Sequence, residues 1–365
     1  RSTAFVADVL GQLGFQATFQ GSLQHATQQP VLAGQRLTSI DLGEDPIQRP
    51  RRLQLVSQFL LPPTALLTLG VALLCFGGSM VLDRAHDRTI AYGGTEWPGN
   101  YVRTDFWQYS FADPIGWNGV NTGGVAPPPR TGHLAVWDDR HDRMLVLCGR
   151  DDGHLPTNTA YALQDSADFM NWQRLAPGGT PPSPRAHAAG IYDPVGDRLL
   201  VFGGSDVSGY PRDDLWQLSL AGVPTWSEIT ATGGPGARED HTAIYDAAHR
   251  RMIVFGGTNS FAGHPGDEAW ALNLPALTWT LLQPTGPTPP VHARHTAVYD
   301  SRRVRMLVFG GDVSWGADAR ETWELDLAVN PPEWTLLEPA LSAQWLPSLR
   351  SLHAAVYDST GDRMV

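Results

Sequence analysis

Arginine and histidine recur at fixed distances before a repeated aspartate, and they are the side chains of this sequence best suited to chemistry. An arginine precedes that aspartate by eight residues in four copies of a repeat, and a histidine precedes it by five residues in four copies. The members are Arg130, Arg185, Arg238 and Arg350, and His133, His241, His295 and His353. Guanidinium groups pair with carboxylates through a planar fork of donors, and imidazoles transfer protons or bind metal ions. The two columns therefore predict a binding or catalytic surface.

A functional asymmetry should appear in the copies that depart from these columns. The third copy moves its histidine to His187, and the fifth has His292 at the arginine position with Arg294 two residues later. The first copy has Cys75 and Gly78 in the two places. A residue that recurs in nearly every copy is also typical of a structural tie between repeats, so both interpretations of the columns stay open.

Acidic and amide side chains form a third set, which follows a glycine pair in the copies. Its members are Asp151, Asp152, Asp206, Asn259 and Asp312. Antiparallel strands would bring these residues to the same face as the arginine and histidine columns. Polar loops around a central channel are a usual place for binding.

Several other chemistries are excluded by composition. All 26 basic residues are arginine, which rules out lysine Schiff bases and a GxxxxGK phosphate loop. The sequence has no GxSxG nucleophile motif and no HExxH zinc motif, and its two cysteines form no CxxC pair. With a net charge of −11 and no basic cluster longer than that of Arg49, Arg51 and Arg52, the chain lacks the surface that nucleic acid requires. We expect no metal, no cofactor and no nucleic-acid partner.

A repeat of about 55 residues supplies the elements that must position these side chains. The repeated aspartates are Asp83, Asp138, Asp193, Asp246, Asp300 and Asp358. An arginine follows each by five residues, and in five copies a Gly-Gly pair, or Cys148-Gly149, follows by ten and eleven. Two aromatic columns come next, Trp107, Tyr161, Trp216, Trp270 and Trp323, and then Trp117, Trp172, Trp226, Trp279 and Trp334.

Short apolar runs such as residues 295–299 and 306–309 predict strands, four to each repeat. Four-stranded units that stack radially form a β-propeller. The aspartate and the arginine would flank the turn between the first two strands, where the aspartate accepts backbone N–H groups. The glycine pair would end the second strand, and the tryptophan columns would pack between blades. We predict an all-β propeller with five complete four-stranded blades and an incomplete sixth.

A Gly-Gly pair that closes a strand, followed by Trp or Tyr and then by Trp at this period, resembles the kelch repeat. The resemblance covers residues 77–365 and implies a propeller, usually of six or seven blades, closed by strands from the two chain ends. The sixth copy stops after its first strand and the start of its second, which argues against closure within this sequence.

The resemblance also implies two enzyme alternatives. Galactose oxidase, a copper-radical enzyme built on this kind of propeller, needs two tyrosines, two histidines and a cysteine cross-linked to a tyrosine. His292 and His295 are three residues apart, but no Tyr-His pair occurs in the chain. Kelch-type sugar epimerases carry scattered Arg, His and Glu on the channel face. The sequence favours neither enzyme over a binding module.

Residues 1–60 lack the repeat and are predicted to form a separate small α/β or irregular segment. Residues 3–13 fit an amphipathic helix, residues 15–19 a strand and residues 53–60 a second helix. The run from Phe5 to Phe15 is faintly similar to a tail segment of pyruvate, water dikinase-like enzymes. No catalytic residue of that family can be placed on this sequence.

Residues 61–76 are predicted to be a hydrophobic linker or part of a membrane span. Residues 64–82 form an uncharged run of 19, near the length that crosses a bilayer, and the arginines of 49–52 would favour a propeller outside. Residues 79–82, however, fit the first strand of the first blade, and prolines and glycines interrupt the run. A span or a signal would favour an exported or cell-surface location, whereas a buried strand or linker is the alternative.

The sequence thus predicts a monomeric propeller at residues 77–365 that binds a protein segment or a carbohydrate on its channel face. The predicted contact residues are Arg130, His133, Arg185, His187, Arg238, His241, Arg294, His295, Arg350, His353, Asp152, Asp206 and Asp312. An enzyme that uses the same face and a purely structural propeller are the alternatives. If the columns bind a ligand, changing Arg185 and Arg238 to alanine should abolish binding at nearly unchanged stability, whereas a collapse in stability would indicate a structural role.

Overall fold

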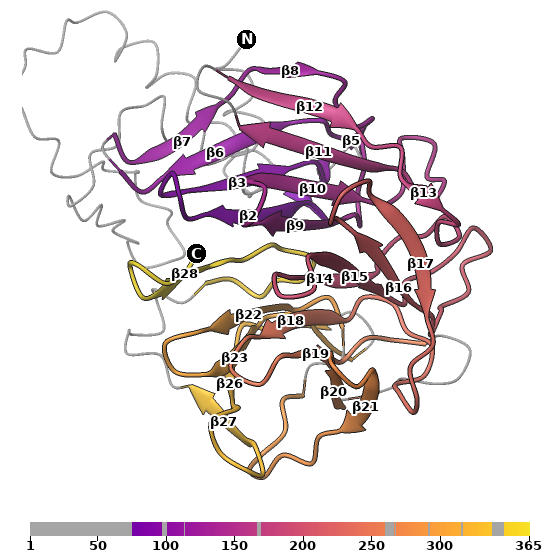
Figure 1. Ribbon diagram of the computed structural model, residues 1–365. Helices are drawn as coiled ribbons and strands as arrows, with labels where there is room; N and C mark the ends of the chain where they lie inside the picture. The colour runs from indigo at the N-terminus through magenta and orange to yellow at the C-terminus, as the bar shows by residue number, and fades with distance from the viewer. Residues whose placement is uncertain are drawn as a thin grey trace, which may run out of the picture. The chain divides into compact units, whose positions relative to one another are not determined.

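Five antiparallel sheets of four strands follow the repeat of the sequence. The computed structural model describes residues 75–365 except 97–100, 113, 166–168, 260–265, 267, 291–292, 315–316 and 338–346. All the regular secondary structure in these ranges is β-strand. The sheets form the blades of a propeller (Figure 1), so the predicted fold is confirmed. Residues 1–60, with their predicted helices and strand, lie outside the described part of the chain.

Each blade consists of four strands in chain order, and the first strands of neighbouring blades contact one another. Blades 1 and 2 are β2 (Ser79–Asp83), β3 (Arg88–Tyr92), β6 (Phe106–Ser110) and β7 (Gly116–Gly119), and β9 (Leu134–Asp138), β10 (Arg143–Leu147), β11 (Ala160–Asp165) and β12 (Met170–Arg174). Blade 3 is β14 (Ala189–Asp193), β15 (Arg198–Phe202), β16 (Leu215–Ser219) and β17 (Thr225–Ile229). Blades 4 and 5 are β18 (Thr242–Asp246), β19 (Arg251–Phe255), β20 (Ala269–Asn273) and β21 (Thr278–Leu281), and β22 (Thr296–Asp300), β23 (Arg305–Phe309), β26 (Thr322–Asp326) and β27 (Glu333–Leu337).

Shorter strands extend or bridge these blades. β8 (Thr122–Gly124) and β13 (Gly178–Gly179) add a parallel strand to the outer edges of blades 2 and 3. β1 (Cys75–Phe76), β4 (Thr95–Glu96) and β5 (Tyr101–Val102) form a small sheet of their own, and β24 (Asp312–Ser314) pairs with β25 (Ala317–Asp318). The sixth copy contributes the hairpin of β28 (Tyr357–Asp358) and β29 (Arg363–Met364).

The repeated aspartate and arginine join the first two strands of every copy. In all six copies the arginine Nε donates to the aspartate across the hairpin, at 2.7–3.0 Å. The same carboxylates accept backbone N–H groups of the turn, for example from Gly196 at 3.1 Å and Gly361 at 3.0 Å. The spacing of five residues between aspartate and arginine therefore corresponds to an ion pair across the hairpin in every copy.

The apolar core lies between blades. Five clusters of buried side chains each join two neighbouring copies of the repeat. The first lies between blades 1 and 2, and the last lies between blade 5 and the sixth copy. The second aromatic column fills these seams: Trp172 packs against Tyr92 of the preceding blade with ring centroids 5.3 Å apart, and Trp334 packs against Phe255 at 5.0 Å. Such pairs bury large apolar areas, so the predicted packing role of this column is confirmed at these seams.

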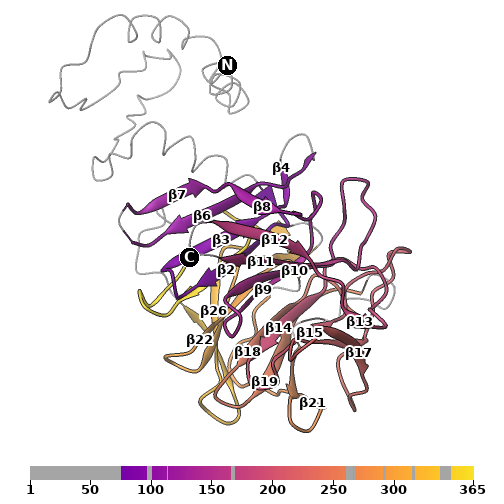
Figure 2. The ribbon, with the colours of Figure 1, turned by 45° about the horizontal axis from the view of Figure 1, so that its top comes forward.

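The ring is continuous from the sixth copy to the first. β28 lies between β22 and β2 (Figure 1), and the first strands succeed one another around the axis (Figure 2). The backbone N–H of Gly77 donates to the carbonyl of Leu352 at 2.8 Å, and the guanidinium of Arg363 lies 4.7 Å over the ring of Phe111. The argument against closure from the short sixth copy was therefore wrong, because a two-stranded hairpin suffices to bridge blades 5 and 1.

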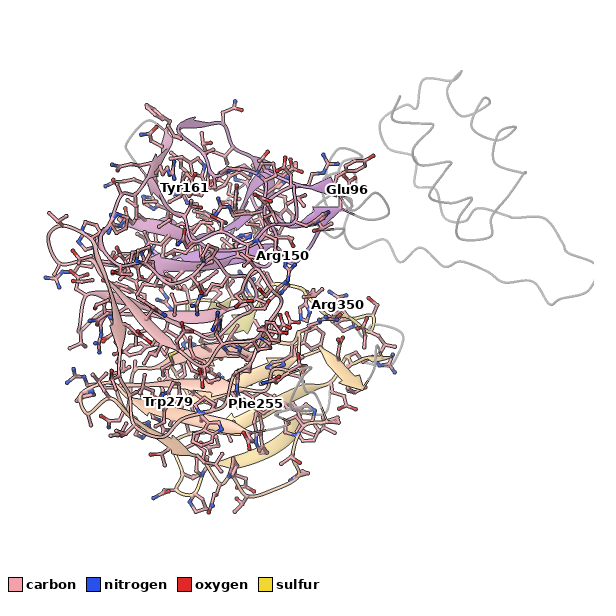
Figure 3. The ribbon with its side chains drawn as sticks, turned by 90° about the vertical axis from the view of Figure 1, so that its right-hand side faces the viewer. Glu96, Arg150, Tyr161, Phe255, Trp279 and Arg350 are labelled. Carbon is pink, nitrogen blue, oxygen red and sulfur yellow. The ribbon has the colours of Figure 1, made fainter. Side chains whose placement is uncertain are left out.

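Two faces of the propeller result from this topology. The channel face carries the starts of the first strands and the loops after the second strands, and the turn face carries the Asp–Arg hairpins. Glu96 of β4 and the loop residues Arg150 and Arg350, all on the channel face, lie along one side of the molecule (Figure 3). Residues 75–82 of the uncharged run belong to β1, β2 and the turn between them. None of the described residues forms a helix of the length and apolarity that a membrane crossing needs.

Candidate functional site

The arginine column lies inside the blades. Arg130, Arg185 and Arg238 are 2%, 0% and 1% exposed, and each donates from Nη1 to the carbonyl at the first position of the Gly pair, 18 residues later. The acceptors are Cys148 at 3.0 Å, Gly203 at 2.9 Å and Gly256 at 2.9 Å. A buried charge needs such partners, because its desolvation is costly. These three guanidinium groups therefore tie the segment before the first strand of a blade to the loop that follows its second strand.

Carboxylates complete two of these ties. Asp214 accepts two hydrogen bonds from Arg185, at 2.6 and 2.7 Å, and Glu268 accepts one from Arg238 at 3.3 Å. Burial alone would raise the pKa of Asp214, but the hydrogen bonds from Arg185 and Trp216 hold it below its usual value. Arg350 differs, since it is only half-buried and donates to the carbonyl and hydroxyl of Ser348.

The histidine column lies at the seams between blades. Each ring packs edge-on against the aromatic residue that ends the second strand of the preceding blade. The pairs are His133 on Tyr92, His241 on Phe202, His295 on Phe255 and His353 on Phe309, with centroids 5.0–5.5 Å apart. In three seams Nε2 is also hydrogen-bonded to a hydroxyl at the start of the preceding first strand. The partners are Ser79 for His133 at 2.7 Å, Thr242 for His295 at 2.8 Å and Thr296 for His353 at 3.0 Å.

Burial keeps these imidazoles neutral. It lowers the pKa of His133, His241 and His295 to about 3 and that of His353 to about 4. Arg130, Arg238 and Arg350 add repulsion at His133, His241 and His353, and His353 does so at His295. At neutral pH each ring offers one donor and one acceptor and no charge.

A ring of six residues surrounds the channel one position before the histidine column. Its members are Gly77, Gly132, His187, Asp240, Arg294 and Leu352, and all have φ between 54° and 69°. The N–H of each donates to the carbonyl of the member before it, at 2.8–3.1 Å, so that the six bonds form a closed circle. Glycine is the residue that this conformation favours, and other residues pay about 1 kcal/mol or more for it. The four non-glycine members thus place side chains at the channel although their backbone conformation is unfavourable for them.

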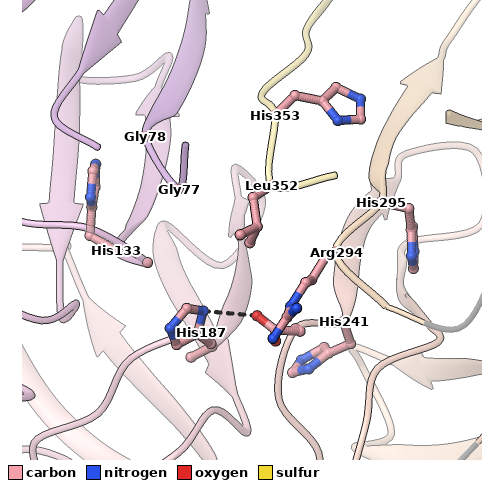
Figure 4. Close-up of a pocket in the computed structure, with 12 residues that line it drawn as sticks. Gly77, Gly78, His133, His187, His241, Arg294, His295, Leu352 and His353 are labelled. Carbon is pink, nitrogen blue, oxygen red and sulfur yellow. Dashed lines mark hydrogen bonds and ion pairs between the residues drawn. The ribbon is translucent and has the colours of Figure 1, made fainter. Parts of the chain in front are cut away.

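Three of these side chains form one charged group. Nδ1 of His187 donates to Asp240 at 2.8 Å (Figure 4), and Nε of Arg294 donates to the other oxygen of Asp240 at 3.0 Å. Nη1 of Arg294 donates to Asp312 at 3.1 Å. Burial alone would raise the pKa of Asp240, but His187 and Arg294 lower it to about 2. Burial lowers the pKa of His187, and Asp240 raises it. The net result is a rise, which the positive charge of Arg150 opposes.

A pocket of about 170 Å³ opens at this ring. It is lined by Gly77, Gly78, Gly132, His133, His187, Ala188, Asp240, His241, Arg294, His295, Leu352 and His353 (Figure 4). The structure therefore brings together six of the predicted contact residues, and it places Arg130, Arg185, Arg238 and Arg350 outside the lining. Asp240, Ala188 and Leu352 were missed from the sequence, although all three occupy positions that vary from copy to copy.

The predicted aspartates have different surroundings. Asp206 is buried and accepts N–H groups of Ser208 and Tyr210 at 2.8 and 3.1 Å, so it shapes its own loop. Asp152 is exposed in the corresponding loop of blade 2. Asp312 alone contacts the ring, through Arg294, and burial raises its pKa.

Potential metal ligands gather on the turn face. Two groups have their ligand atoms within 4.8 Å of one another, Asp83 with His86 and Asp142, and Asp138 with His141 and Asp197. The repeated aspartate of each group already accepts a hydrogen bond from its arginine. In the fifth copy Arg303 takes the place of the histidine and bridges Asp300 and Asp362 at 2.8 and 2.6 Å. In that copy the protein itself thus supplies the positive group between the two carboxylates.

No Tyr or Cys is among the pocket-lining residues, so the pocket as described has no ligand set of the copper-radical kind.

Comparison with known proteins places the repeat in a family. A family model described as the KLHDC2/KLHL20/DRC7 Kelch-repeats domain matches residues 77–264 and 241–365. Host cell factor 2 of Homo sapiens is 31% identical over 247 residues, 59% of this chain and 30% of that protein. Adagio protein 3 of Arabidopsis thaliana is 28% identical over 186 residues, 50% of this chain and 28% of that protein. Putative adagio-like protein 2 of Oryza sativa subsp. japonica is 28% identical over 195 residues, 52% and 29% of the two chains.

This chain therefore spans less than a third of the length of these three relatives. The family match begins at residue 77. The similarity of residues 5–15 to dikinase tails falls outside both that match and the described residues.

Proposed function

Because the chain belongs to the kelch-repeat family of β-propellers, we propose that it is a protein-interaction module whose channel face binds a segment of a partner protein. The ring of six residues supports this proposal. Its polar half, His187, Asp240 and Arg294, faces a half made of two glycines and Leu352. A purely structural ring would be served best by glycine throughout, so the side chains at its costly positions favour recognition over support.

The size of the pocket favours a protein segment over a small molecule as the partner. Pockets that bury a small molecule usually enclose about 300–1,000 Å³. This pocket encloses about 170 Å³, which suits one or two side chains. A free sugar or a small substrate would leave most of its surface in solvent there. A protein segment can place one side chain in the pocket and gain the rest of its contact area on the surrounding loops.

Those loops carry apolar side chains that are more than half exposed. On the channel face they are Tyr101, Leu155, Val207, Tyr210 and Leu349. They come from blades 1, 2 and 3 and from the connection that leads into the sixth copy. Aromatic and aliphatic side chains around a polar centre provide the anchors on which protein interfaces depend.

Substitution of two of these anchors tests the proposal. We expect Leu155→Ser combined with Val207→Ser to weaken binding of peptides selected from a phage-displayed library of random 12-residue sequences by tenfold or more. The matched control is Val195→Ser with Val223→Ser, two equally exposed valines on the turn face. Fluorescence anisotropy of the selected peptides measures both variants. Equal affinity for the two variants, or the absence of any saturable peptide, would contradict a binding role for the channel face and favour a structural propeller.

A further inference from the structure

One seam of the propeller breaks the pairing between histidine and hydroxyl. In three seams a blade carries the histidine, and the first strand of the blade before it begins with a hydroxyl residue. These residues are Ser79, Thr242 and Thr296. The seams without the histidine have Ala188 or Gly78 in its place, and the preceding copy there has Leu134 or Ala354 instead of a hydroxyl. Between blades 3 and 4 the histidine is kept, as His241, but the preceding first strand begins with Ala189.

His241 consequently lacks the hydroxyl that its counterparts bind. It is 6% exposed, and its Nε2 has no hydrogen-bond partner among the described residues. A buried polar group in this state costs about 1–3 kcal/mol. The same imidazole at three other seams binds an aliphatic hydroxyl through Nε2. Among the described seams that keep the histidine, this one alone lacks the hydroxyl that Nε2 binds elsewhere.

His241 belongs to the lining of the pocket. His241 lines the pocket together with Ala188, which stands where other blades have a bulky imidazole. The flanking residues Asp240 and His187 come from the two blades that form this seam, and Arg294 closes the group (Figure 4). The small side chains of Ala188 and Ala189 thus belong to the same seam as His241, next to the polar half of the ring.

We propose that His241 binds the hydroxyl of a serine or threonine side chain from the segment that the channel face recognises. The inference rests on the proposed function and names the side chain that enters the pocket. A neutral imidazole can donate to a hydroxyl or accept from it, as its counterparts do. A carboxylate fits less well, because it would meet the like charge of Asp240. A guanidinium or ammonium group offers donors alone and would face Arg294.

Supplying the missing hydroxyl from the protein itself tests this inference. Ala189→Ser reproduces the arrangement of Ser79 and His133. We expect the thermal midpoint to rise by about 2–4 °C. We expect serine- or threonine-containing peptides from the phage library to bind at least tenfold more weakly, since the serine now occupies the position that their hydroxyl takes. The matched control is Ala354→Ser, which adds a hydroxyl at the same strand position in a seam without a histidine and should change neither quantity.

The peptide supplies a second arm that needs no protein variant. Replacing the serine or threonine of a selected peptide by alanine or valine should weaken binding to the unaltered protein about tenfold and should have no effect on binding to Ala189→Ser. This arm stays informative if Ala189→Ser fails to fold.

Two results would overturn the inference and leave the proposed function standing. One is a set of peptides that depend on Leu155 and Val207 but not on a hydroxyl. The other is a rise in the thermal midpoint of Ala189→Ser at unchanged affinity, which would mean that His241 binds only an internal water. If no peptide binds saturably, both proposals fail together.

Discussion

Replacing Arg185 with alanine is expected to lower the free energy of unfolding by about 3–5 kcal/mol, as the loss of one partner from a buried ion pair does. The side chain is fully buried and supplies two hydrogen bonds to Asp214 and one to the carbonyl of Gly203. Its removal takes these three donors away, leaves Asp214 with the indole N–H of Trp216, and opens a void of the size of a guanidinium. Urea denaturation at pH 7.5 measures the loss.

An arginine that is itself half-exposed provides the control for that experiment. Arg212 pairs with Asp206 on a channel-face loop of the same blade, and its side chain is 46% exposed. Exposed ion pairs contribute about 0–1 kcal/mol, so Arg212→Ala should cost no more than that. If Arg185→Ala cost as little as Arg212→Ala, the structural role of the buried column would be refuted. This expectation replaces the earlier one, in which alanine at Arg185 and Arg238 removes binding and spares stability.

The blades could be predicted because their determinants are local and repeat. An aspartate and an arginine five residues apart fix a hairpin wherever they occur, and a glycine pair ends the second strand because a side chain would collide there. A Cβ at Gly257 would lie 2.8 Å from the Cβ of His241, for instance. Each of these constraints involves one residue type in one column, so the column is visible in the sequence.

The ring around the channel could not be predicted in the same way. Its six positions hold Gly, Gly, His, Asp, Arg and Leu, and what they share is a backbone conformation and a circle of hydrogen bonds. Neither property has a signature in residue type. For this reason His187 resembled a displaced member of the histidine column, although the structure places Ala188 in that column and His187 in the ring.

The unpaired His241 was hidden for a related reason. It occupies a regular position, and its peculiarity lies in Ala189, some 50 residues earlier in the preceding blade. Only the contact between blades shows that Ser79, Thr242 and Thr296 are the partners of this column. Sequence columns describe what one blade has, whereas this site depends on what two neighbouring blades lack together.

Lowering the pH from 7.5 to 5 is expected to destabilise the propeller by several kcal/mol. The pKa of His133, His241 and His295 is lowered by burial to about 3, whereas an unfolded histidine has a pKa near 6.5. Below pH 6.5 the unfolded chain therefore binds protons that the folded chain does not, so stability falls as the pH falls toward 3. At pH 5 each buried histidine costs roughly 2 kcal/mol. His187, whose pKa is raised, acts in the opposite direction and offsets part of this loss.

A single substitution separates this mechanism from a general effect of acid. In His295→Gln the amide can still reach Thr242, but the side chain no longer titrates. The loss of stability between pH 7.5 and 5, measured by urea denaturation against the variant's own value at pH 7.5, should then be smaller by roughly 2 kcal/mol. An unchanged loss would mean that His295 does not contribute to the acid sensitivity. Because the carboxylates with a lowered pKa lose their contribution only below about pH 4, this interval reports on the histidines between the blades.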